Sequence, residues 1–204
     1  STKWMEEINE HGGYKLATQE FNTIERMEKR GTKPFKHSEF NPYVEAFWGW
    51  WPDLYQSLDT FRITGGEPLL SKDTWKVLGY ILETETPNKN LKLSINSNLG
   101  VPDELIDRLI QKLDRIIKEE RVKEVVIFTS CEGYEKQAEY TRYGLDFDKL
   151  ISNIDKILLV LDRVTIVMMS TFNLFSVFSY ERLIKKVYEL KRKHFTTRRY
   201  WNSA

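Results

Sequence analysis

The feature that most constrains this chain is a regular alternation of short apolar runs and longer amphipathic stretches that begins after Leu58. Strand-like runs rich in β-branched residues occupy positions 60–64, 91–96, 124–129 and 164–169. Apolar residues recur at helical spacing in the stretches 72–84, 103–118 and 147–161, and Ser179 can cap a final helix. Because strands that alternate with helices form parallel sheets with right-handed crossovers, the sequence predicts an α/β fold. Two architectures fit this pattern, an open doubly wound sheet and a whole or partial (β/α) barrel.

The first part of the chain, residues 1–57, lacks this alternation and is predicted to be an irregular and helical segment apart from the α/β unit 58–204. Within it, Asn41 is a good helix cap and Pro42 a good first helical residue, and the helix is expected to break at Pro52. This helix also carries three closely spaced tryptophans, Trp48, Trp50 and Trp51. Such a cluster can be a ligand platform or can pack the helix onto a sheet, and we favour packing.

The charge balance and the single cysteine narrow the class of protein. The 204 residues include 31 Lys or Arg and 30 Asp or Glu, and the net charge of +1 argues against nucleic-acid binding, which needs a positive excess. No apolar run approaches the ~20 residues of a membrane-spanning helix and no apolar signal core opens the chain, so a cytoplasmic protein without a membrane partner is expected. Cys131 is alone, and the histidines are far apart in sequence, so no metal ligand is assigned within this chain.

The most informative motif follows the first strand-like run, which leads into Gly65, Gly66, Glu67 and Pro68. Paired glycines let the backbone approach a ligand closely and adopt angles that are closed to other residues. Pro68 stiffens the loop, and Glu67 offers a carboxylate to an ammonium or hydroxyl group. A tight turn with a solvated glutamate would show the same residues. A phosphate-binding loop is excluded, because no Gly-Lys-Ser/Thr follows.

This motif resembles the Gly-Gly-Glu-Pro motif of radical S-adenosylmethionine enzymes, which ends their second barrel strand. The resemblance implies that Gly65, Gly66, Glu67 and Pro68 bind the cofactor S-adenosylmethionine and hold the amino group of its methionine moiety. It covers roughly residues 58–199, with the motifs in the family's order. The implied fold is an incomplete (β/α) barrel of the radical S-adenosylmethionine type with parallel strands.

Two further strand ends carry polar residues in matching places. Ser97 and Asn98 resemble the Thr-Asn-Gly-type end of the family's third strand, although Leu99 stands where the family often has glycine. Asn173, after the last strand-like run, is similar to an asparagine that often approaches the adenosine of the cofactor. The resemblance implies that Ser97, Asn98 and Asn173 bind the cofactor, whereas taken alone each is also a common turn residue.

The third strand-like run ends in Ser130, Cys131 and Glu132, and Arg142 follows. These residues resemble the family's Ser-x-Asp/Glu-Gly turn with its later Arg-x-Gly. The resemblance implies that Ser130 and Glu132 face the adenosine ribose. It also implies that Arg142 pairs with the cofactor carboxylate, for which the guanidinium fork suits a bidentate contact. Cys131 is interpreted as an ordinary small buried residue.

Radical S-adenosylmethionine enzymes hold a [4Fe–4S] cluster on three cysteines and take an electron from an external donor, and this chain has one cysteine. The chain is therefore expected to be a fragment that begins downstream of the cysteine loop and is inactive alone; a scaffold that has lost its cluster is the other explanation. In the intact enzyme, S-adenosylmethionine would be cleaved to a 5′-deoxyadenosyl radical that abstracts hydrogen from an unknown small-molecule or peptide substrate. The stretch 41–54 also resembles proteins with a half-size (twitch-type) auxiliary-cluster domain.

Two other classes of protein remain open. One is a cluster-free α/β module that binds a nucleotide or peptide without redox catalysis. The other is a cluster-free α/β enzyme that uses Glu67 as an acid or base. In all three cases the loops that follow the strands are where the site is expected.

Overall fold

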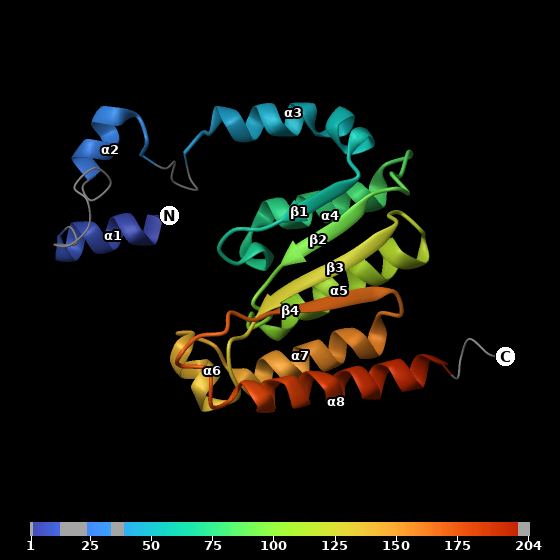
Figure 1. Ribbon diagram of the computed structural model, residues 1–204. Coiled ribbons are helices and arrows are strands. Elements are labelled where there is room, and N and C mark those ends of the chain that lie inside the picture. The colour runs from blue at the N-terminus through green and yellow to red at the C-terminus, as the bar shows by residue number, and fades with distance from the viewer. Residues whose placement is uncertain (1, 13–23, 34–38, 200–204) are drawn as a thin grey trace. The chain divides into compact units, whose positions relative to one another are not determined.

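The computed structural model of the chain describes residues 2–12, 24–33 and 39–199 (Figure 1). It divides into two compact units, Ser1–Asp53 and Leu54–Ala204. The first unit holds α1 (Thr2–His11), α2 (Ile24–Arg30) and most of α3 (Pro42–Ser57). Much of the segment predicted to be irregular, including residues 13–23 and 34–38, lies outside the described residues. No helix in the described part of the chain has the length and apolarity that crossing a membrane requires.

Helix α3 begins as predicted but does not end as predicted. The side-chain oxygen of Asn41 accepts a hydrogen bond from the Tyr43 N–H at 3.0 Å, which confirms the cap. The predicted break at Pro52 is wrong, because the helix continues through this residue to Ser57. A proline inside a helix removes one backbone hydrogen bond and bends the axis without having to end the helix. Rings of this helix also pack on each other before the proline, with centroids of Phe47 and Trp51 5.4 Å apart.

The second unit is built on a four-stranded sheet that confirms the α/β prediction. Its strands are β1 (Thr60–Ile63), β2 (Lys92–Asn96), β3 (Glu124–Ser130) and β4 (Val164–Met169). All neighbours pair in parallel, in the order β1-β2-β3-β4. The register places Ile95 beside Ile63 on one side and beside Ile127 on the other.

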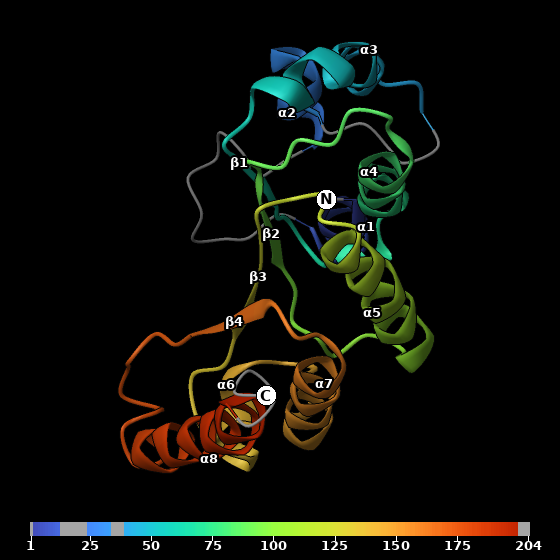
Figure 2. The same ribbon diagram turned by 90° about the vertical axis from the view of Figure 1, so that its right-hand side faces the viewer.

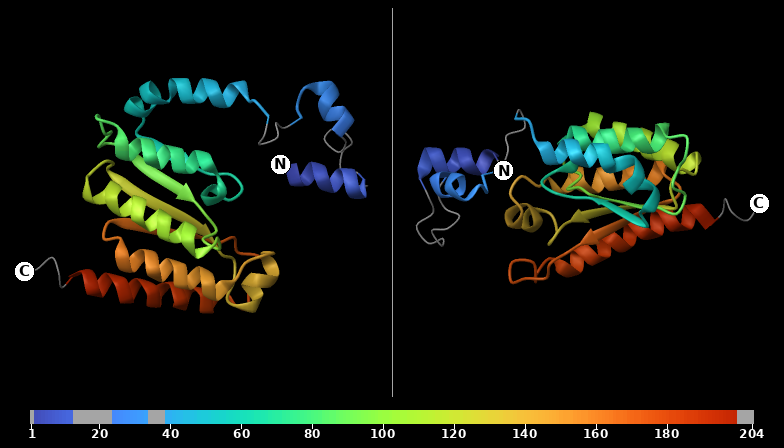
Figure 3. Two further views of the ribbon diagram at one scale, coloured as in Figure 1. Left: turned by 180° about the vertical axis from the view of Figure 1, so that it is seen from behind. Right: turned by 90° about the horizontal axis from the view of Figure 1, so that it is seen from above.

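Helices connect successive strands, as the periodicity predicts. They are α4 (Lys72–Glu83), α5 (Asp103–Lys118) and α7 (Phe147–Val160), with the short η1 (Pro68–Leu70) and α6 (Lys136–Thr141) before two of them and α8 (Tyr180–Arg199) after β4. Figures 2 and 3 show α4, α5 and α7 on the same face of the sheet. Among the described strands the order never reverses, and a doubly wound sheet requires such a reversal. Winding in one direction also occurs in (β/α) barrels.

The core of this unit lies between the sheet and these three helices. Leu93, Ile95 and Ile127 point into it and are fully buried, as are Leu109 and Leu113 of α5. In β3, buried residues alternate with half-buried ones, so the face of the sheet opposite these helices is only partly covered. Because the strands are parallel, their carboxyl ends share one edge, and the loops that carry the predicted site residues all leave from it.

Candidate functional site

The carboxylate of Glu67 joins the loops that follow β1 and β2. Its Oε1 accepts hydrogen bonds from the Ser97 hydroxyl at 2.9 Å and from the Leu69 N–H at 3.1 Å. Its Oε2 accepts one from the Asn98 N–H at 2.9 Å. A carboxylate oxygen accepts about two hydrogen bonds, so Oε2 can take a further donor such as an ammonium group. The structure thus brings together three of the predicted site residues and holds the carboxylate in one orientation.

The paired glycines leave open space beside the same loop. Gly65 has a φ of +135°, a conformation that side-chain-bearing residues rarely adopt. A Cβ placed on Gly65 or Gly66 would meet no atom within 4 Å. Pro68 is buried and begins η1, for which Glu67 is the cap. A ligand backbone can therefore reach the peptide groups of Gly65 and Gly66 directly.

The backbone at Leu99 has a conformation that suits glycine. Leu99 has a φ of +53°, in the left-handed region that favours glycine, yet its side chain is fully buried. The Ser97 hydroxyl accepts a hydrogen bond from the Leu99 N–H at 3.0 Å, and the Asn98 side-chain oxygen accepts one from the Gly100 N–H at 2.8 Å. Burial of the leucine side chain offsets the strain of this backbone conformation.

Glu132 and Arg142 bind each other. The guanidinium donates from Nε to one carboxylate oxygen at 3.0 Å and from Nη2 to the other at 2.6 Å. This hydrogen-bonded pairing raises the pKa of Arg142 above its ordinary value. The resemblance assigns the two residues to different parts of the cofactor, whereas in this structure the fork of Arg142 faces Glu132. A cofactor carboxylate would have to share the guanidinium through its remaining Nη1 or displace Glu132.

Cys131, directly before Glu132 in the chain, is buried, and its thiol donates to the Gly133 carbonyl oxygen at 3.2 Å. Burial raises the pKa of this thiol, so it is a poor nucleophile and a poor metal ligand. These properties agree with an ordinary buried residue. Within the described ranges, no three His, Cys, Asp or Glu side chains are grouped to hold a metal ion.

The remaining predicted residues occupy the end of β3 and the loop after β4. Ser130 is the last residue of β3 and pairs with Met169 at the end of β4. Asn173 forms a turn, because its side-chain oxygen accepts from the Phe175 N–H at 2.9 Å and its amide donates to the Thr171 carbonyl at 3.0 Å. Ser130 lies at the shared edge, whereas the side chain of Asn173 is engaged within its own loop.

Three further polar atoms at this edge belong to residues that were not predicted as site residues from the sequence. The side-chain oxygens of Asn96, Thr129 and Ser170 are buried, and in the described chain they have no hydrogen-bond partner. They lie at the carboxyl ends of β2, β3 and β4. Native proteins rarely leave such atoms unpaired outside binding sites and water sites. Polar residues that end otherwise apolar strands are the signal that could have identified them.

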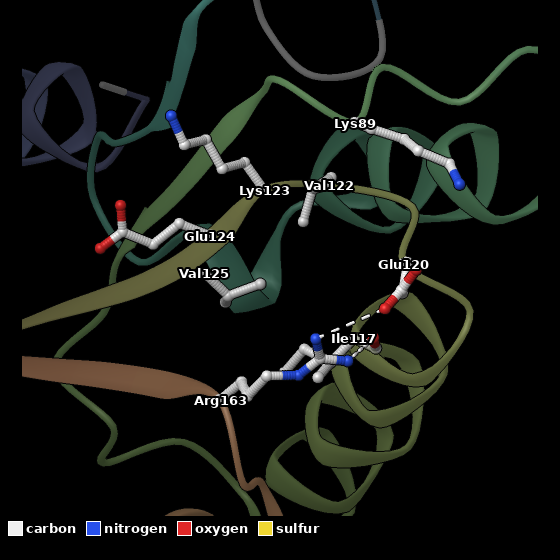
Figure 4. Close-up of a pocket in the computed structure, with 8 residues that line it drawn as sticks. All are labelled: Lys89, Ile117, Glu120, Val122, Lys123, Glu124, Val125 and Arg163. Carbon is white, nitrogen blue, oxygen red and sulfur yellow. Dashed lines mark hydrogen bonds and ion pairs between the residues drawn. The ribbon is translucent and has the colours of Figure 1, made fainter.

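A cavity of about 230 Å³ lies at the opposite, amino-terminal end of the strands (Figure 4). Its charged lining residues are Lys89, Glu120, Lys123, Glu124 and Arg163. Arg163 donates to the Ile117 carbonyl at 2.7 Å and lies 3.7 Å from a carboxylate oxygen of Glu120. The guanidinium here caps the carboxyl end of α5, where the Ile117 carbonyl also accepts the Glu120 N–H at 3.2 Å.

No protein-family model, no curated protein and no solved structure matches this chain. The function of this chain is therefore inferred from the geometry at the carboxyl ends of the strands.

Proposed function

We propose that the unit Leu54–Ala204 is an incomplete (β/α) barrel that binds S-adenosylmethionine, as part of a radical S-adenosylmethionine enzyme. One observation carries the proposal: the Glu67 carboxylate is held by Ser97 and Asn98 beside the open peptide groups of Gly65 and Gly66. The winding of the sheet in one direction supports the barrel class.

The residues at this edge suit a cationic amino acid moiety. Oε2 of Glu67 would accept a hydrogen bond from the ligand ammonium, a charge-assisted contact that fixes its orientation. The peptide groups of Gly65 and Gly66 would lie against the methionine chain, and Arg142 would attract the carboxylate. Bound S-adenosylmethionine supplies, once reduced, the hydrogen-abstracting chemistry of this enzyme class.

The residues present do not fit a [4Fe–4S] cluster. Such a cluster needs three thiolates, and the chain has only the buried Cys131 with its raised pKa. The ligands of such a cluster would have to come from outside this chain. The proposal for the described residues is cofactor binding and orientation.

Calorimetric titration of the 204-residue chain with S-adenosylmethionine tests the proposal. Saturable binding is expected, and Glu67→Gln should weaken it by about tenfold, because a charge-assisted contact becomes a neutral one. Gly66→Val should weaken it further, because its side chain would occupy the open space beside the peptide group. Glu120→Gln, at the amino-terminal cavity, is the matched control and should bind like the parent. Parent-like affinity in both site variants would refute the proposal.

Decarboxylated S-adenosylmethionine isolates the contribution of Arg142. If Arg142 contacts the cofactor carboxylate, the parent should bind the decarboxylated analogue about ten- to a hundredfold more weakly than the cofactor. Arg142→Ala should bind the two compounds equally. A parent that does not distinguish them would show that Arg142 remains with Glu132 and leaves the cofactor carboxylate to other groups.

The occupied fork of Arg142 and the single cysteine favour one second candidate, a cluster-free module that binds a nucleotide without redox catalysis. Such a module would recognise the adenosine alone. Adenosine and S-adenosylmethionine should then bind with similar affinity, and Glu67→Gln should change neither.

A further inference from the structure

The face of the sheet opposite α4, α5 and α7 carries an arginine laid across three strands. Arg62 of β1 pairs in register with Ser94 of β2, and its guanidinium carbon lies 4.4 Å from the centre of the Phe128 ring on β3. Side chains that are paired in a parallel sheet share a face, so Arg62, Ser94, Asn96 and Phe128 all belong to this one. The arginine side chain therefore passes over β2 to reach the ring.

Two polar residues of β2, Ser94 and Asn96, lie on the same face as this arginine and are largely shielded from solvent. Ser94, the register partner of Arg62, is only 5% exposed although these three helices do not cover its face, as expected for a residue beneath the path of the arginine stem. The side-chain oxygen of Asn96, next along this face, is buried and unpaired in the described chain. The face thus combines a fixed cation, an aromatic platform and a polar side chain with unused hydrogen-bonding capacity.

The charge of Arg62 is not neutralised by any carboxylate of the described residues. The other two charged side chains that the strands place on this face, Lys92 and Glu124, lie 3.7 Å apart and offset each other. The guanidinium carbon lies over the Phe128 ring, and the Arg62 side chain donates no hydrogen bond to the other described residues, so its N–H donors are available to a ligand.

We propose that this face binds a small molecule through an oxyanion group, a carboxylate or a phosphate, held by the guanidinium fork of Arg62. Phe128 holds the fork in place, and Asn96 offers a second polar contact. Anion binding is inferred here from the geometry alone. That the bound anion is part of the enzyme's substrate rests on the proposed function. It follows from the position of the site, since Arg62 precedes the proposed cofactor loop by a few residues and Asn96 directly precedes Ser97. A ligand anchored at Arg62 would then extend toward the cofactor.

Nuclear magnetic resonance titration of the full chain with sodium acetate and with inorganic phosphate tests the proposal. We expect saturable shifts of the Arg62 Nε–H signal and of the Phe128 and Asn96 signals, and the tighter of the two anions identifies the group. Arg62→Gln should lose about tenfold or more in affinity, because it removes a charge-assisted contact. Phe128→Leu should weaken binding to a smaller extent.

Arg108→Gln is the matched control, since the Arg108 guanidinium lies 4.3 Å from a tryptophan ring of α4 on the helical layer. This variant should bind both anions like the parent. The proposal is overturned if the parent shows no saturable shift at Arg62, or if Arg62→Gln binds the anions as tightly as the parent. S-adenosylmethionine affinity, measured on the same samples, should be equal in parent and Arg62→Gln. Loss of anion binding in Arg62→Gln with cofactor binding retained would support this inference. Absence of cofactor binding in the parent would contradict the proposed function and leave the anion site standing.

Discussion

The two ends of the parallel sheet use their polar groups in different ways. At the amino-terminal end, Arg163 donates to the Ile117 carbonyl at 2.7 Å and Arg121 donates to the Ile81 carbonyl at 2.9 Å. Both carbonyls belong to the last turns of helices, where the regular backbone donors run out, and the Ile117 carbonyl also accepts the Glu120 N–H at 3.2 Å. The two arginines cap the carboxyl ends of α5 and α4, so these N–H donors are used in contacts within the protein.

At the carboxyl end, hydrogen-bonding capacity is left unfilled. Glu67 has room for another donor on Oε2, and the side-chain oxygens of Asn96 and Thr129 have no partner among the described residues. Leu99 holds a left-handed backbone conformation at the same edge. The comparison teaches that the two ends differ in unfilled hydrogen-bonding capacity, although the cavity of about 230 Å³ lies at the amino-terminal end.

The largest expected effect concerns the strain at Leu99. Leu99→Ala should lower the free energy of unfolding by about 2–4 kcal/mol, because it removes a fully buried side chain. Leu99→Gly should be more stable than Leu99→Ala by about 1 kcal/mol, because glycine adopts a positive φ without strain. Urea unfolding measures both values.

Leu109, fully buried in α5, is the control for this pair of variants. In a regular helix the order reverses, and Leu109→Gly should be less stable than Leu109→Ala by about 1 kcal/mol. The same order at both positions would show that the left-handed conformation does not strain Leu99, and this would weaken the contrast between the two ends.

An intermediate effect is expected at the amino-terminal end. Arg163→Ala should lower the free energy of unfolding by about 1 kcal/mol, since the Ile117 carbonyl loses one of its two donors and keeps the Glu120 N–H. Affinity for S-adenosylmethionine should not change. Arg115→Ala, which breaks only an exposed pair with Glu119 on the same helix, should cost about 0.5 kcal/mol or less. A loss of cofactor affinity in Arg163→Ala would contradict the structural role of this end.

The smallest effect concerns the pairing of α7 with α8. The hydrogen bond from Lys193, with a further one from His194, holds the pKa of Asp155 below its usual 3.8, while partial burial opposes this shift. A lowered pKa in the folded state stabilises the protein above the unfolded pKa, and this stabilisation is lost as the pH falls through the folded value. Asp155→Asn should cost about 0.5–1 kcal/mol at pH 7 and progressively less below about pH 4. Unfolding of parent and variant at both pH values checks this, and a difference that grows in acid would contradict it.

The regular part of the fold was predictable because its periodicities are strong. The helix predicted at 103–118 was found as Asp103–Lys118, and the strand predicted at 164–169 as Val164–Met169. Pro52 misled the prediction, because a proline can bend a helix as well as end it. The order of the strands required the structure, since periodicity does not report which strands are neighbours.

The candidate site was predictable only in part. The loops that carry Glu67, Ser97 and Asn98 could be placed at one edge from the strand pattern, but the hydrogen bonds among them depend on tertiary register. The pairing of Glu132 with Arg142 could not be derived, because sequence does not show whether an arginine faces a ligand or a neighbouring carboxylate. The path of Arg62 across β2 likewise depends on the side-chain rotamer.

The attachment of Glu67 to both loops has a mechanical consequence for α7. Its Oε1 accepts from the Ser97 hydroxyl, which accepts from the Leu99 N–H, and the Leu99 carbonyl accepts at 2.7 Å from the buried side-chain amide of Asn153. These contacts link the loop after β1 to the loop after β2 and, through the Leu99 backbone, to α7. Opening the loop after β1 would break the bonds of Glu67 to the loop after β2. We therefore expect that a ligand which displaces Glu67 would also disturb the Asn153 contact of α7, although this helix contributes no side chain to the carboxylate's own neighbours Ser97, Asn98 and Leu69.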